Sequence, residues 1–179
     1  LQVERLDPAE KVGNLALVTT AGALVSMLTQ PVAGLISDRT RSRHGRRAPW
    51  MVVGTAAGAV LMVVLGMQHS LLGLLLGWVG VSIAYNLAQA PLTAILPDRI
   101  PRLARGSFSA VTGMGMLVGM LAGQFLASSL ADAVLLAYLV LAAACLVVFT
   151  LFTWRNPDRS SAEEPREPFS LRTFARTYW

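Results

Sequence analysis

Five long uncharged stretches dominate this chain of 179 residues. Each approaches or exceeds the roughly 20 helical residues that cross a bilayer core of about 30 Å, and none has Lys, Arg, Asp or Glu in its middle. Only 14% of the residues are charged, against about a quarter in soluble domains. The pattern predicts an all-α membrane protein with five transmembrane helices. The expected spans are about 14–36, 50–67, 71–96, 107–129 and 133–154.

Positive charge lies in three clusters that alternate with uncharged turns. Of the 15 Lys and Arg residues, 13 fall within residues 39–47, 99–105 and 155–176. Basic loops stay in the cytoplasm, so one orientation satisfies every connection. We expect an integral protein of the plasma (inner) membrane, with an extracytoplasmic lead-in at 1–13, cytoplasmic basic loops and a cytoplasmic linker at 155–179 rich in proline and mixed charge.

A short motif occurs twice, sixty residues apart. PVAGLISDR at 31–39 aligns without gaps with PLTAILPDR at 91–99, and both copies end a span that runs towards the cytoplasm. Asp38 and Asp98 then lie at helix C-termini, where the helix dipole disfavours a carboxylate. Adjacent arginines or the N-terminus of a neighbouring helix would stabilise them. The aspartates are therefore either a conformational latch or a solvated helix end.

The arginine-rich loop resembles a known signature. Its residues look like the loop between the second and third helices of the major facilitator superfamily, secondary transporters built from two six-helix halves. The residues that carry this resemblance are Gly34, Asp38, Arg39, Gly45, Arg46 and Arg47. The long form SDRTRSRHGRRAPW is similar to the branch of sucrose carriers and glycoside-pentoside-hexuronide symporters.

A second motif supports the same branch. Asn86, Gln89, Pro91, Ala94 and Asp98 resemble the N-x-x-Q-x-P-x-x-A-x-x-x-D run in the fourth helix of sucrose carriers. The sequence departs from plant sucrose carriers at Thr93, where they have an arginine associated with sugar binding. The resemblance covers helices two to six plus the central linker. It implies a partial N-terminal half that lacks the first helix, with the C-terminal half of the same transporter as its missing partner.

The candidate functional residues follow from these patterns. Polar side chains near the middle of a span suit solute binding, and an amide can both donate to and accept from sugar hydroxyls. Hydrogen bonding between helices is the other reading of the same side chains. The candidate substrate-binding residues are Tyr85, Asn86, Gln89 and Thr93. The candidate gate residues are Gly34, Asp38, Arg39, Gly45, Arg46, Arg47, Asp98 and Arg99.

The expected activity is secondary active transport of a small polar solute, such as a sugar, by alternating access. The expected partners are that solute, a proton or other cation, and membrane lipid. An exporter of drugs or metabolites and a non-transporting membrane scaffold remain alternatives. The sequence has no metal-ligand cluster, nucleophile with its base, or phosphate-binding loop, so we expect no enzyme activity, cofactor or metal. Nucleic-acid binding is not expected, because spans flank the arginine loop.

Glycines at four-residue spacing predict close helix contacts. Such spacing leaves a flat helix face on which a neighbouring backbone can pack. The sets are Gly54 with Gly58, Gly73 with Gly77, and Gly115 with Gly119 and Gly123.

Overall fold

The computed structural model describes residues 2–157, with the side chains of 95–99 outside the description. Five long helices cover the five predicted apolar stretches, and they are long and apolar enough to cross a membrane, with mean hydropathies of 1.5 to 2.8. The predicted all-α class with five membrane helices is therefore confirmed. The helices are α2 (Lys11–Arg39), α3 (Ala48–Gly66), α4 (Leu71–Arg99), α5 (Arg105–Ser129) and α6 (Val134–Arg155). Two short elements, α1 (Gln2–Leu6) and the 3-10 turn η1 (Arg102–Ala104), complete the described chain.

Local signals set several helix ends. Pro49 stands in the first turn of α3, where its missing N–H costs nothing. Before α4, the Ser70 hydroxyl accepts a hydrogen bond from the Gly73 N–H at 3.1 Å. Helix α2 continues through Pro31 and ends only where Thr40 becomes extended. The predicted spans are therefore shorter than the helices at most ends. The predicted linker at 155–179 lies outside the described residues beyond Pro157.

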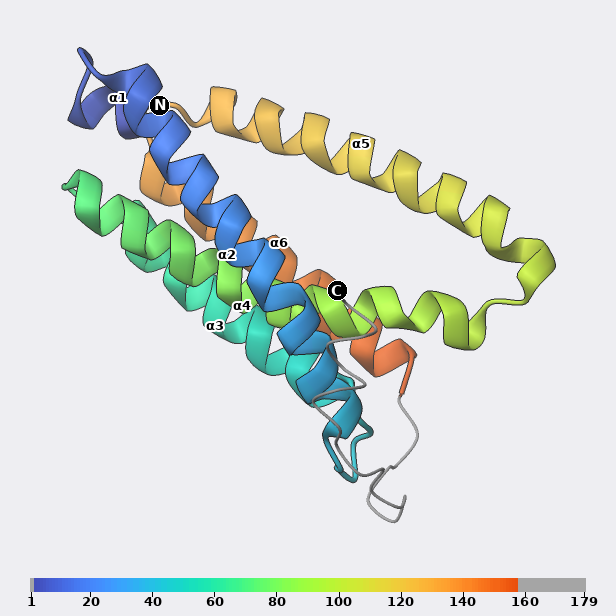
Figure 1. The fold of residues 1–179 in the computed structure, drawn as a ribbon. Helices are drawn as coiled ribbons and strands as arrows, with labels where there is room; N and C mark the ends of the chain where they lie inside the picture. Colours follow the sequence, from blue (N-terminus) through green and yellow to red (C-terminus); the bar gives the residue numbers. More distant parts are fainter. Residues whose placement is uncertain (1, 158–179) are drawn as a thin grey trace.

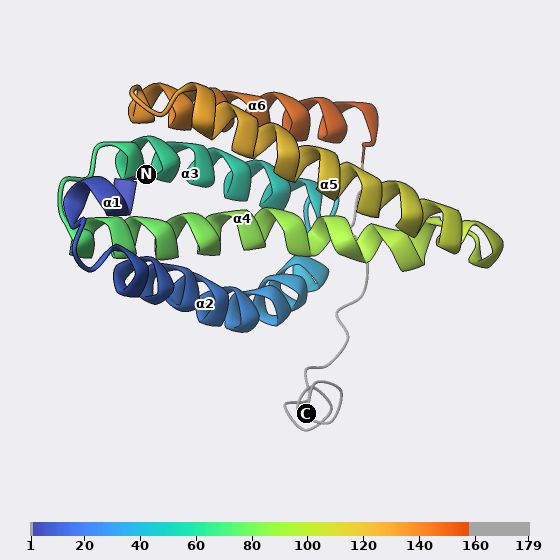
Figure 2. The same cartoon turned by 90° about the horizontal axis from the view of Figure 1, so that it is seen from above.

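Four of the helices form one layer. Figure 2 shows them side by side in the order α2, α4, α3, α6, and the main contacts join these same neighbours. Helices α3 and α4 approach closely at Gly54, where an added Cβ would lie 2.7 Å from the Ala84 carbonyl oxygen. At Gly58 the Tyr85 ring fills the equivalent space at 3.0 Å. The prediction of close packing at this glycine pair is confirmed.

Helix α5 stands apart from this layer. It begins beyond the far end of α4 and runs back towards α1 (Figure 1), with its main contacts to η1 and α6. No residue of α5 is buried against the described chain. At Gly115, Gly119 and Gly123 an added Cβ would meet no described atom within 4 Å. The prediction that this ladder packs on a helix is therefore wrong for the described residues, because α5 diverges from its neighbours.

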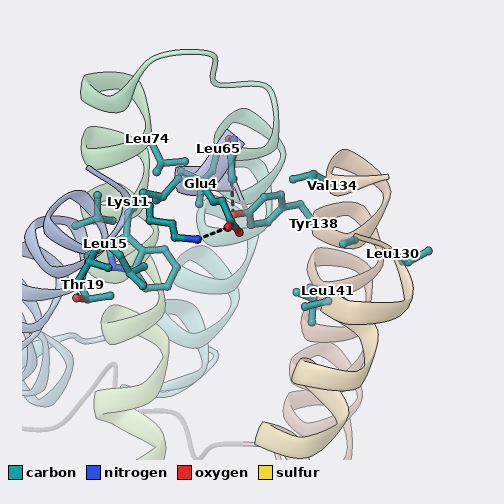
Figure 3. A pocket seen from close by; sticks show the side chains of 17 residues that line it. Glu4, Lys11, Leu15, Thr19, Leu65, Leu74, Leu130, Val134, Tyr138 and Leu141 are labelled. Carbon is teal, nitrogen blue, oxygen red and sulfur yellow. Dashed lines mark hydrogen bonds and ion pairs between the residues drawn. The ribbon is translucent and has the colours of Figure 1, made fainter. Parts of the chain in front are cut away.

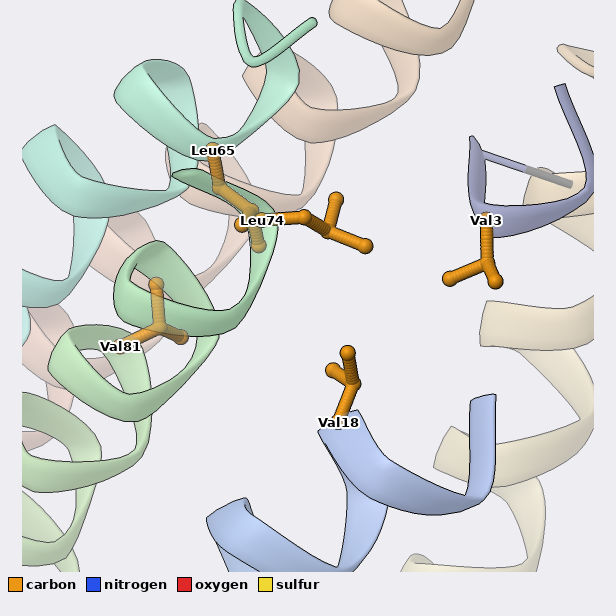
Figure 4. Close-up of a cluster of buried hydrophobic side chains, with 5 residues drawn as sticks. All are labelled: Val3, Val18, Leu65, Leu74 and Val81. Carbon is orange, nitrogen blue, oxygen red and sulfur yellow. The ribbon is translucent and has the colours of Figure 1, made fainter. Parts of the chain in front are cut away.

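A small buried cluster lies at the end of the bundle that carries α1. Val3 of α1 joins Val18 of α2, Leu65 of α3, and Leu74 and Val81 of α4 (Figure 4). The opposite end carries the arginine loop between α2 and α3 and the start of α5. Apolar side chains face outward elsewhere, as lipid contact requires: Leu24, Val60, Leu117 and Val148 are more than half exposed. The protein is an integral membrane protein.

Candidate functional site

The loop from Thr40 to Arg47 is a compact turn held by its own polar groups. The Thr40 hydroxyl accepts from the Trp50 indole N–H at 2.6 Å and donates to the Ile36 carbonyl at 2.9 Å. The Gly45 N–H donates to the Ser42 carbonyl at 3.0 Å. Gly45 has a φ of 89°, in the left-handed region that glycine enters at little cost. The glycine of the signature is therefore required by the turn.

Asp38 has a partner at the start of the next helix. Its Oδ1 lies 3.9 Å from Nη2 of Arg47, and Arg47 is the residue that precedes α3. The Asp38 side chain is 59% exposed, while that of Arg47 is 12% exposed. The ion pair joins the last turn of α2 to the first turn of α3. An arginine, one of the two stabilising sources expected for Asp38, is therefore present, and it stands immediately before α3.

The remaining gate residues are not all part of this contact. Arg39 is exposed in the last turn of α2, and Arg46 is half-buried in the loop. Gly34 lies one turn before Asp38, and a Cβ added there would meet no described atom within 4 Å. Asp98 and Arg99 end α4, among the residues whose side chains are not described. The second copy of the motif is therefore helical, and the contacts of its Asp98 and Arg99 side chains lie outside the description.

A row of polar residues follows one face of α4. Asn86 is 6% exposed, and its Nδ2 donates to the Ser26 hydroxyl of α2 at 2.9 Å and to the Ser82 carbonyl at 2.7 Å. Gln89 and Thr93 lie three and seven residues later on the same face, and both are exposed. The Thr93 hydroxyl donates to the Ala90 carbonyl at 2.9 Å. We call Asn86, Gln89 and Thr93 the α4 polar row.

Tyr85 belongs to a different face of α4. Its hydroxyl lies 3.1 Å from Sδ of Met62, and its ring covers Gly58, both on α3. Consecutive helical residues point about 100° apart, so Tyr85 and Asn86 face different neighbours. The structure brings Asn86, Gln89 and Thr93 together and separates Tyr85 from them.

Sequence reasoning missed part of this α2–α4 contact. A serine or threonine within a membrane helix commonly bonds a carbonyl three or four residues back, as Thr19 and Thr29 do. Ser26 instead accepts from Asn86 across the interface. Ser82 also adds a turn to the polar face of α4, since it stands four residues before Asn86. The recurrence of polar residues every three to four positions along α4 is the signal that could have identified Ser82.

A cavity of about 700 Å³ lies towards α1, at the end of the bundle away from the arginine loop. Its walls come from α1, α2, α4 and α6 with the end of α5, and they are mostly apolar (Figure 3). Trp78 lines it on α4, eight residues before Asn86 and on the same side of the helix. Among the described side chains, which leave out those of 95–99, no three His, Cys, Asp or Glu residues gather as metal ligands would. On α4 the cavity wall ends at Trp78, and the hydroxyl and amide groups of the polar row begin further along the same helix.

Comparison with known proteins yields one family. The sequence profile of the Major Facilitator Superfamily matches residues 8–179. A sucrose transport protein of Arabidopsis thaliana is 27% identical over 62% of this chain and 26% of its own length. An uncharacterized symporter of Synechocystis sp. is 32% identical over 51% of this chain and 18% of its own. A general alpha-glucoside permease of Schizosaccharomyces pombe is 39% identical over 28% and 9%.

The chain thus spans about a quarter or less of the length of these three relatives. No solved structure shows significant similarity to it. The profile match extends over almost the whole sequence and includes both the arginine loop and the α4 polar row. Together with the five apolar helices, it shows that the chain belongs to the major facilitator superfamily.

Proposed function

We propose that this chain is part of a secondary active transporter that moves a sugar or a similar polyhydroxylated solute by alternating access. The observation that carries the proposal is the exposure of Gln89 within a membrane helix, with the exposed Thr93 on the same face. The Thr93 hydroxyl already bonds a carbonyl of its own helix, so the cost of exposing a polar group to lipid applies to the Gln89 amide. A polar group facing hydrocarbon without a partner costs several kcal/mol, on the order of 2 to 7. Such side chains are stable where they line a water-filled path, and that path is where solute binds.

The chemistry of the row suits a neutral polyol. Gln89 carries two donors and a carbonyl acceptor, and Thr93 adds a hydroxyl. Asn86 holds the row in register against α2 through Ser26. No charged side chain lies among these groups, which favours an uncharged solute over an anion or a cation. Tyr85, packed on α3, contributes to the shape of the helix pair and not to solute contact.

The relatives add support for substrate and coupling. Two of them are named for sucrose transport and alpha-glucoside permeation, and one is named a symporter. A coupled proton or cation is therefore part of the proposal. The middle of the five spans has no carboxylate. We place the coupling group in another part of the transporter, which we propose includes a second helical half.

The Asp38–Arg47 pair is proposed as the latch on the cytoplasmic side. Surface ion pairs contribute about 0.2 to 1 kcal/mol, so a pair with one exposed partner can break at small cost when α2 and α3 move. The loop between α2 and α3, the start of α5 and the end of α6 lie at one end of the bundle (Figure 1). The positive-inside rule makes that end cytoplasmic.

Uptake by the full-length protein in proteoliposomes tests the proposal. Radiolabelled mono- and disaccharides are offered with and without an inward proton or sodium gradient. We expect uptake of at least one sugar, with accumulation when the gradient is present. Gln89→Leu should remove most of the sugar uptake. Gln68→Leu, the same substitution in the turn between α3 and α4, should leave uptake unchanged. Absence of sugar flux under all gradients would contradict the proposal, and efflux of an amphipathic dye would favour an exporter.

A further inference from the structure

Helix α1 makes a set of polar contacts at the end of the bundle opposite the arginine loop. The Gln2 Nε2 donates to the Leu65 carbonyl at 3.0 Å and to the Gln68 carbonyl at 3.2 Å. These carbonyls belong to the last turn of α3 and the turn after it, where backbone acceptors lack partners within the helix. Gln2 Oε1 accepts from the Tyr138 hydroxyl of α6 at 3.1 Å. One side chain thus ties the ends of α3 and α6 together.

Arg5 extends these contacts to the hairpin between α5 and α6. Its Nη2 donates to the Ala131 carbonyl at 2.7 Å and lies 3.5 Å from Oδ1 of Asp132. Helix α5 has no buried residue, and in α6 only Ala142 is buried. Apolar packing therefore does little to fix this end of α5, and Arg5 adds a solvent-exposed polar contact to the turn that follows it.

The same short helix covers the mouth of the cavity. Val3 is 8% exposed and points towards Val18 and Leu74, which line the cavity from α2 and α4 (Figure 4). Glu4 and Lys11 form an ion pair at the rim, with Nζ 2.6 Å from Oε1 (Figure 3). Helix α1 therefore combines an apolar plug on its inner side with polar contacts at its edges.

We propose that α1 is a strap that closes the cavity between α2, α4 and α6 at this end, and that its release admits water and solute to the α4 polar row. The proposal deepens the transport function proposed above by assigning the closing element opposite the Asp38–Arg47 latch. Gln2 and Arg5 act as positioning residues, since they contact helix ends and not solute. All their contacts are polar, so water can replace each one when the strap moves.

Thiol labelling in lipid nanodiscs tests the strap, because both ends of the helices face the reagent and no transport is needed. The full-length protein, with Cys145→Ser and any other cysteines replaced, carries a single reporter. Val18→Cys reports on the plugged mouth, and Ala59→Cys is its control in α3. Both native side chains are 5% exposed. A membrane-impermeant maleimide then measures the labelling rate of each reporter.

Three strap variants are compared with one control. Gln2→Met removes the bonds to α3 and α6, Tyr138→Phe removes only the bond to α6, and Arg5→Met releases the α5–α6 turn. One lost hydrogen bond shifts a closed-to-open equilibrium about fivefold. Labelling of Val18→Cys should therefore accelerate about fivefold in Tyr138→Phe and more in Gln2→Met. Arg102→Met, in η1 at the other end, should leave the rate unchanged.

Two results would overturn the strap. The first is an unchanged Val18→Cys rate in Gln2→Met and Arg5→Met. The second is an equal acceleration at Ala59→Cys, which would mean general loosening of the bundle and not opening at one end. Neither result depends on solute, so the strap can fail while sugar uptake persists. Equally, uptake can be absent while the strap opens as expected.

Discussion

Replacing Gly54 with alanine should separate α3 from α4. An added Cβ would lie 2.7 Å from both the Ala84 oxygen and the Ala88 nitrogen, and 3.1 Å from the Ala88 Cβ. Two of these atoms are backbone, which cannot rotate away, so the overpacking cost lies near the upper end of the usual range of about 1 to 3 kcal/mol. The higher helix propensity of alanine offsets about 1 kcal/mol of this overpacking cost. The expected net loss of stability is about 2 kcal/mol.

Gly119→Ala is the matched change on α5. A Cβ at Gly119 would meet no described atom within 4 Å, so only the propensity term applies and stability should rise by up to about 1 kcal/mol. Denaturant titration in detergent micelles, followed by tryptophan fluorescence, should separate the two variants by about 3 kcal/mol. Equal destabilisation by both substitutions would refute the reasoning, because α5 would then pack as tightly as the α3–α4 pair.

Three further outcomes are expected. Gly45→Ala should cost about 1 to 2 kcal/mol in thermal unfolding, since alanine resists a φ of 89°, and Gly45→Asn should cost less. Asn86→Leu removes one interhelical hydrogen bond to Ser26, which should lower the stability measured by denaturant titration by only about 0.6 kcal/mol. The same substitution should reduce sugar uptake several-fold. Lys11 lowers the pKa of the Glu4 carboxyl, chiefly by hydrogen bonding to it. Their contact therefore stabilises the fold above the ordinary pKa of 4.5, and this stabilisation is lost as the pH falls through the lowered pKa. Thermal unfolding of Glu4→Gln should show a smaller loss on acidification through that window than the native chain does.

The helices were predictable because their signal is strong and local. An apolar run of about 20 residues has few alternatives to a membrane helix, since every backbone group must be satisfied within the segment. Their ends were less predictable. The expected span stopped at residue 36, yet α2 continues through Asp38 and Arg39 and is capped by Thr40. Charge marks the membrane boundary, whereas the helix ends where the backbone turns.

The contacts between helices were harder to predict from the sequence. The spacing of Asn86, Gln89 and Thr93 predicts their shared face, and the same periodicity would have separated Tyr85 from them. The partner of Asp38 is Arg47, nine residues later, and adjacency along the chain favoured nearer arginines. Helix α1 went unrecognised because five residues are too few for a helical period to stand out. Its stability comes from tertiary contacts such as those of Gln2.

Solute protection of a cysteine in the α4 polar row tests the central claim most directly. Gln89→Cys, in the full-length protein with no other cysteine, should react with an impermeant maleimide, and a transported sugar should slow the reaction in proportion to its occupancy. Leu76→Cys provides the control on another face of α4, where the native side chain is 61% exposed. Its reaction should not respond to sugar. We predict that sugar slows the labelling of Gln89→Cys and not that of the control. If Gln89→Cys is labelled at the same rate with and without a sugar that the protein takes up, a solute path along this row is contradicted.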